Sequence, residues 1–312
     1  MHLYVFGRFY LIMLFQNQKV LLNCFSKKTL IEYIQTNCTD EEIARLEEIN
    51  RKWEIGQRIF QTLTEQEAGI QSTVDVRSIS DVFNEKLKRI EQEPQFKNTY
   101  EKATHGFRMV EIDKLVTYQN GVYLDFVEKL LKELPRNPSE ADLIDICLPL
   151  KKEYAPVLRL KSADSSYVYS SDSQDLRVIG SYSRPIEKIN LAEDTISGVP
   201  VRCLITLIGY GLPIVSVLDV NQMLVLFNGF HRLYALRYLG VTHVPVLVQQ
   251  IPTLADLPGS CQAQWFYNLI AYPRPPLMKD YFTPDLTIDT KTIPRKKTIK
   301  VTISHETIDF PI

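Results

Sequence analysis

The segment between Pro213 and Ile251 constrains the fold more than any other part of the chain, because apolar runs of strand length alternate there with turn and helix signals. Residues typical of turns separate the apolar runs, as in strands that pair with one another. A glycine after the helical stretch suits the C′ position of a helix. In chain order the segment predicts strands Pro213–Val217 and Met223–Phe227 around a turn at Asp219–Gln222, a helix His231–Leu239 closed by Gly240, and a buried strand Val244–Ile251.

Residues 27–105 have the pattern of a helical region. Apolar residues recur at helical spacing from Thr39 to Leu63, and charged residues occupy the opposite face. Thr39 and Glu42 have the spacing of a capping box and mark the predicted start of this helix. A second helix is predicted after Ser80, a suitable N-cap, and it ends at Pro94.

The first 26 residues are apolar and aromatic, but Gly7 and Arg8 interrupt the run. The run is too short to span a membrane and no small-residue cleavage site follows it, so neither a membrane helix nor a signal peptide is predicted. Three interpretations stay open: a strand, a docking segment, or an extension upstream of a true start at Met13.

From residue 106 the pattern changes to short strands mixed with short helices, which predicts an α+β fold. A Ser/Asp-rich turn between short apolar runs favours an inserted hairpin or flap. We expect four regions: an apolar segment (1–26), a helical N-terminal region (27–105), a small mixed sheet with packed helices and an insertion near 136–200 (106–252), and a C-terminal helix with a basic, Pro-containing tail (253–312).

The composition is that of a globular protein, with 45% hydrophobic and 23% charged residues and a formal net charge of −1. This charge argues against a surface that binds nucleic acid everywhere and is compatible with a local basic patch. Five scattered cysteines without a CxxC motif indicate a reducing, cytoplasmic compartment. Five histidines without ligand spacing predict no metal site made by the protein alone.

The junction Asn228–Arg232, which reads NGFHR, is the main candidate site. Asn228 is a favoured N-cap, and Gly229 lets backbone or ligand approach closely. His231 and Arg232 follow in the first helical turn, where the helix dipole disfavours a cation. An anion would reverse this penalty, so the exposed amides, the guanidinium and the imidazole together predict a phosphate site. The alternative is structural: Arg232 pairs with a nearby carboxylate, and His231 is a satisfied, half-buried side chain.

The stretch GLPIVSVLDVNQMLVLFNGFHRLYALRYLGVTHVPVLV resembles the signature of the ParB/sulfiredoxin superfamily. Its phosphate-binding turn is matched by Gly229, His231 and Arg232. Met109–Val116, with Gln119, resembles the first strand and the following loop. The resemblance implies a ParB/sulfiredoxin-like small mixed sheet with packed helices. The residues it matches, together with those of the junction, give the expected nucleotide contacts: Asn228, Gly229, His231, Arg232, Pro213 and Gln119.

Two departures narrow the activity that the resemblance implies, and one analogy suggests another activity. Phe230 stands where sulfiredoxins carry a catalytic cysteine, so sulfiredoxin activity is not expected. No helix-turn-helix pattern follows the last strand, so a centromere-binding clamp is not expected. Some relatives are free-serine kinases with an acidic base, and by analogy Glu111, Asp113 or Asp219 would take that role.

Three functions remain. The leading prediction is a nucleotide-binding protein that holds ATP, ADP or CTP with Mg²⁺ at Asn228–Arg232 and hydrolyses it or transfers phosphate, with His231 and Glu111 as catalytic residues. The second is a DNA-associated protein, binding DNA or cutting it as a nuclease, whose tail residues Arg295, Lys296 and Lys297 contact backbone phosphates. The third is a non-catalytic scaffold that uses the helical N-terminal region and the aromatic residues Trp265, Phe266 and Tyr267. No membrane partner is expected, and the sequence leaves the oligomeric state open.

Overall fold

The computed structural model describes residues 15–100, 104–150, 154–160, 166–171, 173, 176–186, 189–191, 194–196, 201–253, 269 and 271–309. Helices and mixed sheets alternate along the chain, so the fold is α+β, as the sequence predicted. The chain forms two compact units: unit 1 is Met1–Lys151 with Pro213–Pro294, and unit 2 is Lys152–Leu212 with Arg295–Ile312. Within the described ranges, no helix is long and apolar enough to cross a membrane.

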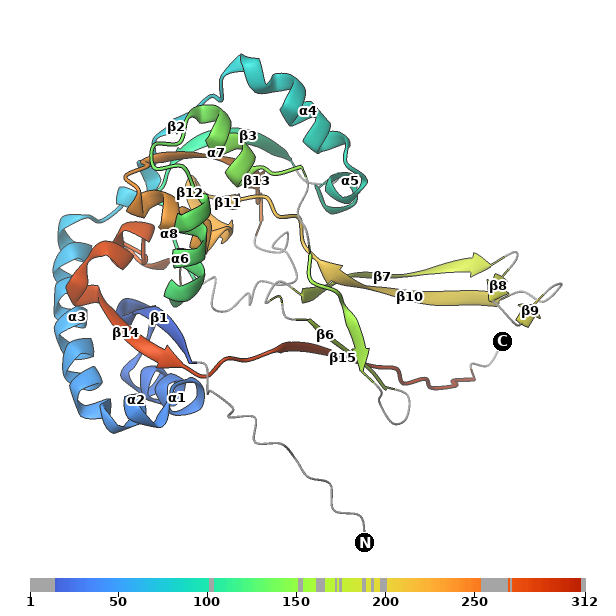
Figure 1. The fold of residues 1–312 in the computed structure, drawn as a ribbon, viewed down its shortest axis with the longest axis horizontal. Coiled ribbons are helices and arrows are strands. Elements are labelled where there is room, and N and C mark those ends of the chain that lie inside the picture. Colours follow the sequence, from blue (N-terminus) through green and yellow to red (C-terminus); the bar gives the residue numbers. More distant parts are fainter. Residues whose placement is uncertain are drawn as a thin grey trace, which may run out of the picture. The chain divides into compact units, whose positions relative to one another are not determined.

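A five-stranded sheet, in the order β12-β11-β13-β3-β2, is the centre of unit 1 (Figure 1). Its strands are β2 (Val76–Arg77), β3 (His105–Glu111), β11 (Ser216–Val220), β12 (Met223–Asn228) and β13 (His243–Gln250). Strand β11 pairs antiparallel with β12 and parallel with β13, which in turn pairs antiparallel with β3. Apolar residues of one sheet face pack with Val116, Leu269 and Leu277 in a buried cluster.

The first strand of the hairpin begins at Ser216, three residues later than the sequence predicted. Proline has no amide hydrogen to give to a ladder, so Pro213 precedes the strand instead of opening it. The turn is also shorter than predicted. Asn221 and Gln222 have φ of 51° and 67°, as a tight two-residue hairpin connection requires, and Asp219 therefore stays within β11.

Helix α8 (Phe230–Tyr238) connects β12 to β13. It begins and ends one residue earlier than predicted, and Gly240, with a φ of 86°, closes it as the sequence predicted. The Gly240 amide donates to the Arg237 carbonyl, and the Val241 amide donates to the Leu236 carbonyl. These bonds satisfy carbonyls of the last turn in the manner of a Schellman motif.

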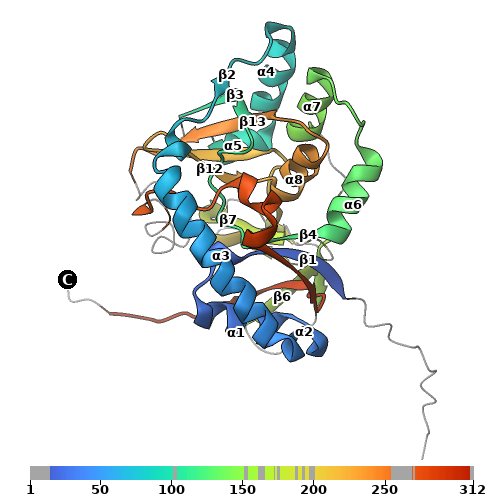
Figure 2. The same ribbon diagram turned by 90° about the vertical axis from the view of Figure 1, so that its left-hand side faces the viewer.

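A second sheet in unit 1 joins the first and last strands of that unit. Its order is β14-β1-β4, with β1 Gln16–Leu21, β4 Gly121–Tyr123 and β14 Thr287–Thr292. Helices α1 (Lys27–Asn37), α2 (Asp40–Ala44) and α3 (Leu46–Gln66) lie beside it (Figure 2). Of the three interpretations of the N-terminal segment, the structure shows a strand for residues 16–21. Residues 1–14 lie outside the described ranges.

The single helix predicted from Thr39 to Leu63 is two helices, interrupted at Arg45. The predicted capping box is wrong, since the Thr39 side chain makes no cap hydrogen bond. The Glu42 carboxylate instead accepts hydrogen bonds from Arg45 Nη1 at 2.9 Å and from the Lys291 amide at 3.2 Å. A contact with β14, distant in the sequence, has replaced the local cap.

The second predicted helix is also divided. Ser80 precedes a short 3₁₀ turn (Asp81–Phe83) without a side-chain cap bond, and α4 (Asn84–Gln92) follows. Helix α4 ends just before Pro94, as predicted, and Pro94 is the first residue of the next helix, α5 (Pro94–Tyr100). Proline is well suited to a first helical position, because the amide hydrogen it lacks would have no helical partner there.

Two further helices of unit 1 pack near the central sheet (Figure 1). Helix α6 (Leu124–Glu133) contacts α8, and α7 (Glu140–Cys147) contacts β13. A complete capping box starts α7: Ser139 Oγ accepts from the Asp142 amide, and the Asp142 carboxylate accepts from the Ser139 amide. The α7 helix, which the sequence placed inside the insertion, therefore belongs to unit 1.

Unit 2 consists of small antiparallel sheets. One has the order β15-β6-β5, with β5 Leu158–Leu160, β6 Ser166–Ser171 and β15 Lys297–Thr302. A long ribbon pairs β7 (Leu176–Ile186) with β10 (Val201–Tyr210), and β8 (Ile189–Leu191) pairs with β9 (Asp194–Ile196). The predicted tail is thus divided between the units, with β14 in unit 1 and β15 in unit 2. The predicted C-terminal helix lies largely outside the described residues.

Candidate functional site

The Asn228–Arg232 turn is shaped by contacts inside unit 1. Gly229, with a φ of 108°, is the N-cap of α8, so the prediction that Asn228 caps the helix is wrong. The Asn228 side chain instead donates to the Ile214 carbonyl at 2.8 Å. A Cβ at Gly229 would lie 2.8 Å from Val215 Cγ2, which is closer than real atoms approach. Both residues thereby fix the end of β12 against the loop before β11.

His231 packs between two aromatic side chains of the β4–α6 segment. Its ring stacks on Tyr123 with centroids 5.8 Å apart and meets Phe126 edge-on at 5.2 Å. Its Nε2 accepts a hydrogen bond from the Tyr123 amide at 3.0 Å, so the proton of the neutral ring lies on Nδ1. Burial lowers the pKa of His231 to about 4, which keeps the ring neutral at pH 7.

Arg232 connects the turn to two other segments. Its Nη1 donates to the Ile146 carbonyl near the end of α7 at 3.1 Å and to the Pro213 carbonyl at 2.5 Å. Pro213, which the sequence predicted as a nucleotide contact, thus contributes its carbonyl oxygen to this internal contact. The structural alternative paired Arg232 with a carboxylate, and these two contacts are with main-chain carbonyls.

Gln119 lies in a loop that contacts the end of β12, just before the Asn228–Arg232 turn, whereas Glu111 lies away from this turn. Gln119 lies in the loop that also supplies Tyr118, whose hydroxyl donates to the Phe227 carbonyl at 3.2 Å, and its own side chain donates to the Gly121 carbonyl at 2.6 Å. Glu111 lies opposite His243 in the sheet, after the C-terminal end of α8, so the structure does not bring it to the first turn. Its carboxylate accepts from the Asp75 amide at 3.1 Å and pairs with Lys114 at 3.0 Å.

The two other acidic candidates have separate surroundings. Asp113 makes a bidentate pair with Arg237 at the C-terminal end of α8, with distances of 2.5 and 3.0 Å. This bond raises the pKa of the Arg237 guanidinium. Asp219 accepts from Gln250 Nε2 at 2.9 Å and lines a pocket elsewhere on the sheet.

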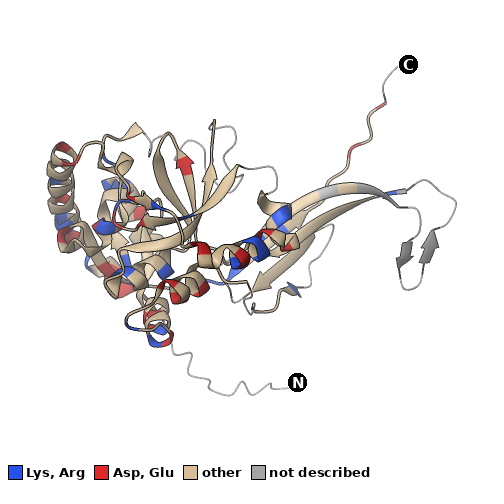
Figure 3. Ribbon diagram, turned by 90° about the horizontal axis from the view of Figure 1, so that it is seen from above, with Lys and Arg blue, Asp and Glu red and all other residues tan. Residues whose placement is uncertain are grey.

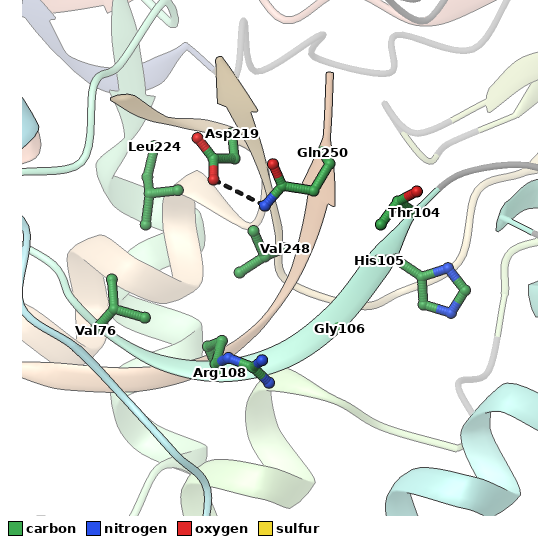
Figure 4. Close-up of a pocket in the computed structure, with 9 residues that line it drawn as sticks. All are labelled: Val76, Thr104, His105, Gly106, Arg108, Asp219, Leu224, Val248 and Gln250. Atoms are coloured by element: carbon green, nitrogen blue, oxygen red, sulfur yellow. Dashed lines mark hydrogen bonds between the residues drawn. The ribbon is translucent and has the colours of Figure 1, made fainter. Parts of the chain in front are cut away.

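That pocket has a volume of about 260 Å³ and is lined by nine residues from the central sheet and its margins, all labelled in Figure 4. It includes none of the residues 228–232. The Arg108 guanidinium reaches it from β3 and the Asp219 carboxylate reaches it from β11, whereas the His105 ring packs against Phe96. Sequence reasoning missed this site, although a charged residue such as Arg108 within the apolar stretch FRMV was a usable signal.

Unit 2 gathers basic residues on its strands (Figure 3). Strands β5, β6, β7, β10 and β15 contain six Lys or Arg residues and no Asp or Glu. The predicted DNA contacts Arg295 and Lys296 lie just before β15, and Lys297 is its first residue; all three are exposed. Trp265, Phe266 and Tyr267 lie outside the described residues.

No group of three or more His, Cys, Asp or Glu side chains suited to hold a metal ion occurs among the described residues. Comparison with protein-family models, with curated proteins and with solved structures finds no match to this chain. The resemblance to the ParB/sulfiredoxin superfamily therefore stays a prediction, and the function has to be argued from the geometry.

Proposed function

We propose that the protein binds single-stranded nucleic acid through one face of the β15-β6-β5 sheet. Residues paired across a sheet share a face, and alternate residues of a strand point to opposite faces. The register pairs Arg159 with Tyr169 and Lys297 with Ser171, and Tyr167 is two residues from Tyr169. Arg159, Tyr167, Tyr169 and Lys297 therefore share one face, which we call the basic–aromatic face. The proposal rests on this placement of two basic residues and two tyrosines on one face of the sheet.

The charge distribution of unit 2 supports the proposal. The unit contains eleven Lys or Arg and nine Asp or Glu residues, so its total charge is close to neutral. Asp194 in β9 is the one acidic residue within the strands of this unit that the structure describes, and its other acidic residues occur in the connecting segments and near the ends. A phosphate backbone that follows these strands meets their positive charge.

The aromatic side chains favour a single strand over a duplex. Tyr167 is 38% exposed, and the Arg159 guanidinium lies over its ring, 5.2 Å from the centroid. Tyrosine rings on a sheet face stack on unpaired bases, at about 1–3 kcal/mol per base, while a duplex keeps its bases stacked on each other. The predicted DNA contact Lys297 belongs to this face.

Fluorescence anisotropy with a labelled oligothymidylate tests the proposal, measured across about 50 to 200 mM salt. Wild-type protein is expected to bind with an affinity that falls as salt rises. Lys297→Gln removes one phosphate contact, so it should flatten the logarithmic salt dependence by about 0.7. Tyr167→Ala should weaken binding at every salt concentration.

Lys300→Gln is the matched control, because Lys300 is an exposed lysine of the same strand whose position falls on the opposite face. It is expected to leave the salt dependence nearly unchanged. Equal effects of the two lysine substitutions, or no binding by the wild type at the lowest salt, would contradict the proposal. Tighter binding of a duplex of the same length would contradict base stacking and indicate that the protein contacts only the phosphate backbone.

Nucleotide binding at Asn228–Arg232 is the second candidate, and one observation favours it. Among the described residues, no hydrogen-bond acceptor pairs with the amides of Phe230 and His231 at the positive end of the α8 dipole. His231 accepts a hydrogen bond and is neutral, so in this candidate function it does not donate a proton. Calorimetry with ATP, ADP and CTP in the presence of Mg²⁺ tests it, and absence of heat at millimolar nucleotide would exclude it.

A further inference from the structure

The pocket on the central sheet brings together two opposite charges that do not pair with each other. Arg108 of β3 lies opposite Val246 of β13, and Asp219 of β11 lies opposite Gln250. The two residues are thus two strand spacings apart, about 10 Å, and about four residues, or 13 Å, apart along the strands. This separation is too large for a direct ion pair, and both side chains line the same pocket (Figure 4).

The Arg108 guanidinium is the positive end of the pocket. Arg108 is exposed, and its Nη1 donates to the Phe107 carbonyl at 2.8 Å. Among the described residues it has no carboxylate partner, so most of its five N–H donors remain for a ligand. The side chain extends toward Gly106, since a Cβ there would lie 3.5 Å from Nη1. Gly106 is opposite Val248, which places the guanidinium beside the middle of the pocket.

The Asp219 carboxylate is the negative end. Its Oδ2 accepts from Gln250 Nε2 at 2.9 Å, which orients the group beside the pocket (Figure 4). Within the described ranges no Lys, Arg or His pairs with Asp219. A half-buried carboxylate without a cationic partner favours a ligand that brings a positive group.

We propose that this pocket binds a small zwitterion whose carboxylate and ammonium groups stand at opposite ends of a short hydrocarbon chain. The carboxylate pairs with Arg108 in bidentate fashion, and the ammonium pairs with Asp219. Val248 of β13 lies between the charged groups and contacts the hydrocarbon chain, and Leu224 borders the pocket beside Asp219 (Figure 4). A volume of about 260 Å³ admits a molecule of this size and excludes a nucleotide-sized one.

Isothermal titration calorimetry with a series of ω-amino acids of increasing chain length tests the proposal: glycine, β-alanine, γ-aminobutyrate and ε-aminocaproate. A longer member should bind more tightly than glycine, because it reaches both charges. Acetate and ethylammonium, which carry one charge each, should bind at least about tenfold more weakly. Arg108→Gln and Asp219→Asn should each weaken binding by about tenfold or more.

Gly106→Val provides a test that changes no charge. A Cβ at this position lies 3.5 Å from Arg108 Nη1, an ordinary contact distance, so the fold is expected to persist while the valine side chain fills part of the pocket. Arg77→Gln is the matched control, since Arg77 is an exposed arginine of the neighbouring strand that already pairs with Asp75. Thermal melting checks that each variant is folded. The proposal is overturned if the wild type binds no member of the series at 10 mM, a concentration on the order of the weakest useful affinity. It is also overturned if folded Gly106→Val binds as well as the wild type. Equal losses of affinity in Arg77→Gln and Arg108→Gln would overturn it too.

Discussion

Gly229 has two independent reasons to be glycine. Its φ of 108° is a conformation that side chains with a Cβ rarely adopt, and its neighbour Val215 leaves no room for a Cβ. Asn228 and Arg232 are held by carbonyl groups of the segment before β11. At the scale of single residues, the NGFHR junction is therefore explained by the packing of α8 against unit 1, whether or not a ligand binds there.

Gly229→Ala is expected to destabilise the protein by about 2–4 kcal/mol, the sum of left-handed backbone strain and overpacking. Gly69→Ala is the control, because Gly69 has a φ of 80° but open space around it, and backbone strain alone should cost about 1 kcal/mol. Urea denaturation measures both. Similar values for the two variants would show that the contact with Val215 is unimportant.

His231 predicts a particular dependence of stability on pH. Its pKa falls from the ordinary 6.5 to about 4 in the folded protein, so the unfolded chain binds this proton more readily. Its contribution is complete above pH 6.5 and is lost as the pH falls toward 4, at a rate of up to about 1.4 kcal/mol for each pH unit between these two pKa values. His231→Gln keeps an acceptor for the Tyr123 amide without titrating. Denaturation curves between pH 7 and 4 (a range set by these pKa values) should therefore be flatter in this variant. An unchanged slope would contradict the burial of His231.

At the scale of elements, local signals succeeded where no distant partner competed. The end of α8 at Gly240 and the start of α7 at Ser139 both rest on bonds between near neighbours. The start of α2 at Thr39 was predicted correctly, but its capping box does not form, because the Glu42 carboxylate accepts from the Lys291 amide of β14 instead. A capping box is therefore a good predictor only where its acidic member is not needed elsewhere.

Ser139→Ala should destabilise the protein by about 1 kcal/mol, because it removes the acceptor for the Asp142 amide. Ser80→Ala is the matched control: Ser80 is an equally exposed serine before a helical turn, but its side chain makes no cap bond. Its expected effect is within about 0.5 kcal/mol. Thermal or chemical denaturation of both variants decides whether the α7 cap acts as described.

At the scale of the whole chain, a buried ionic cluster joins segments far apart in sequence. Arg274 is fully buried and binds the Asp280 carboxylate at 2.6 and 2.7 Å and Glu67 at 2.9 Å. The sequence placed Arg274 in the basic C-terminal region (253–312), and the structure buries it. The buried guanidinium is tolerated because two carboxylates neutralise its charge. It also lies over the Phe60 ring, with Cζ 5.4 Å from the ring centroid.

Asp280→Ala should destabilise unit 1 by about 3–5 kcal/mol, because it leaves the Arg274 charge buried with a single, partly exposed partner. Replacing both residues, as in Arg274→Met with Asp280→Leu, should cost less than the single substitution. Asp289→Ala is the control. The Asp289 side chain is 63% exposed, so its ion pair with Lys19 should contribute less than about 1 kcal/mol to stability. Equal losses in the two single variants would contradict the role of burial.

The sequence by itself determined the α+β class, the return strand, and α8 with its glycine end, since these depend on apolar period, turn residues and caps within a few positions. Only the tertiary structure decided that β14 pairs with β1, that residues 295–312 join the insertion in unit 2, and that Arg108 and Asp219 line one pocket. Those arrangements depend on register between strands that are tens to hundreds of residues apart. Local periodicity contains no information on which strands pair, because any apolar strand satisfies it.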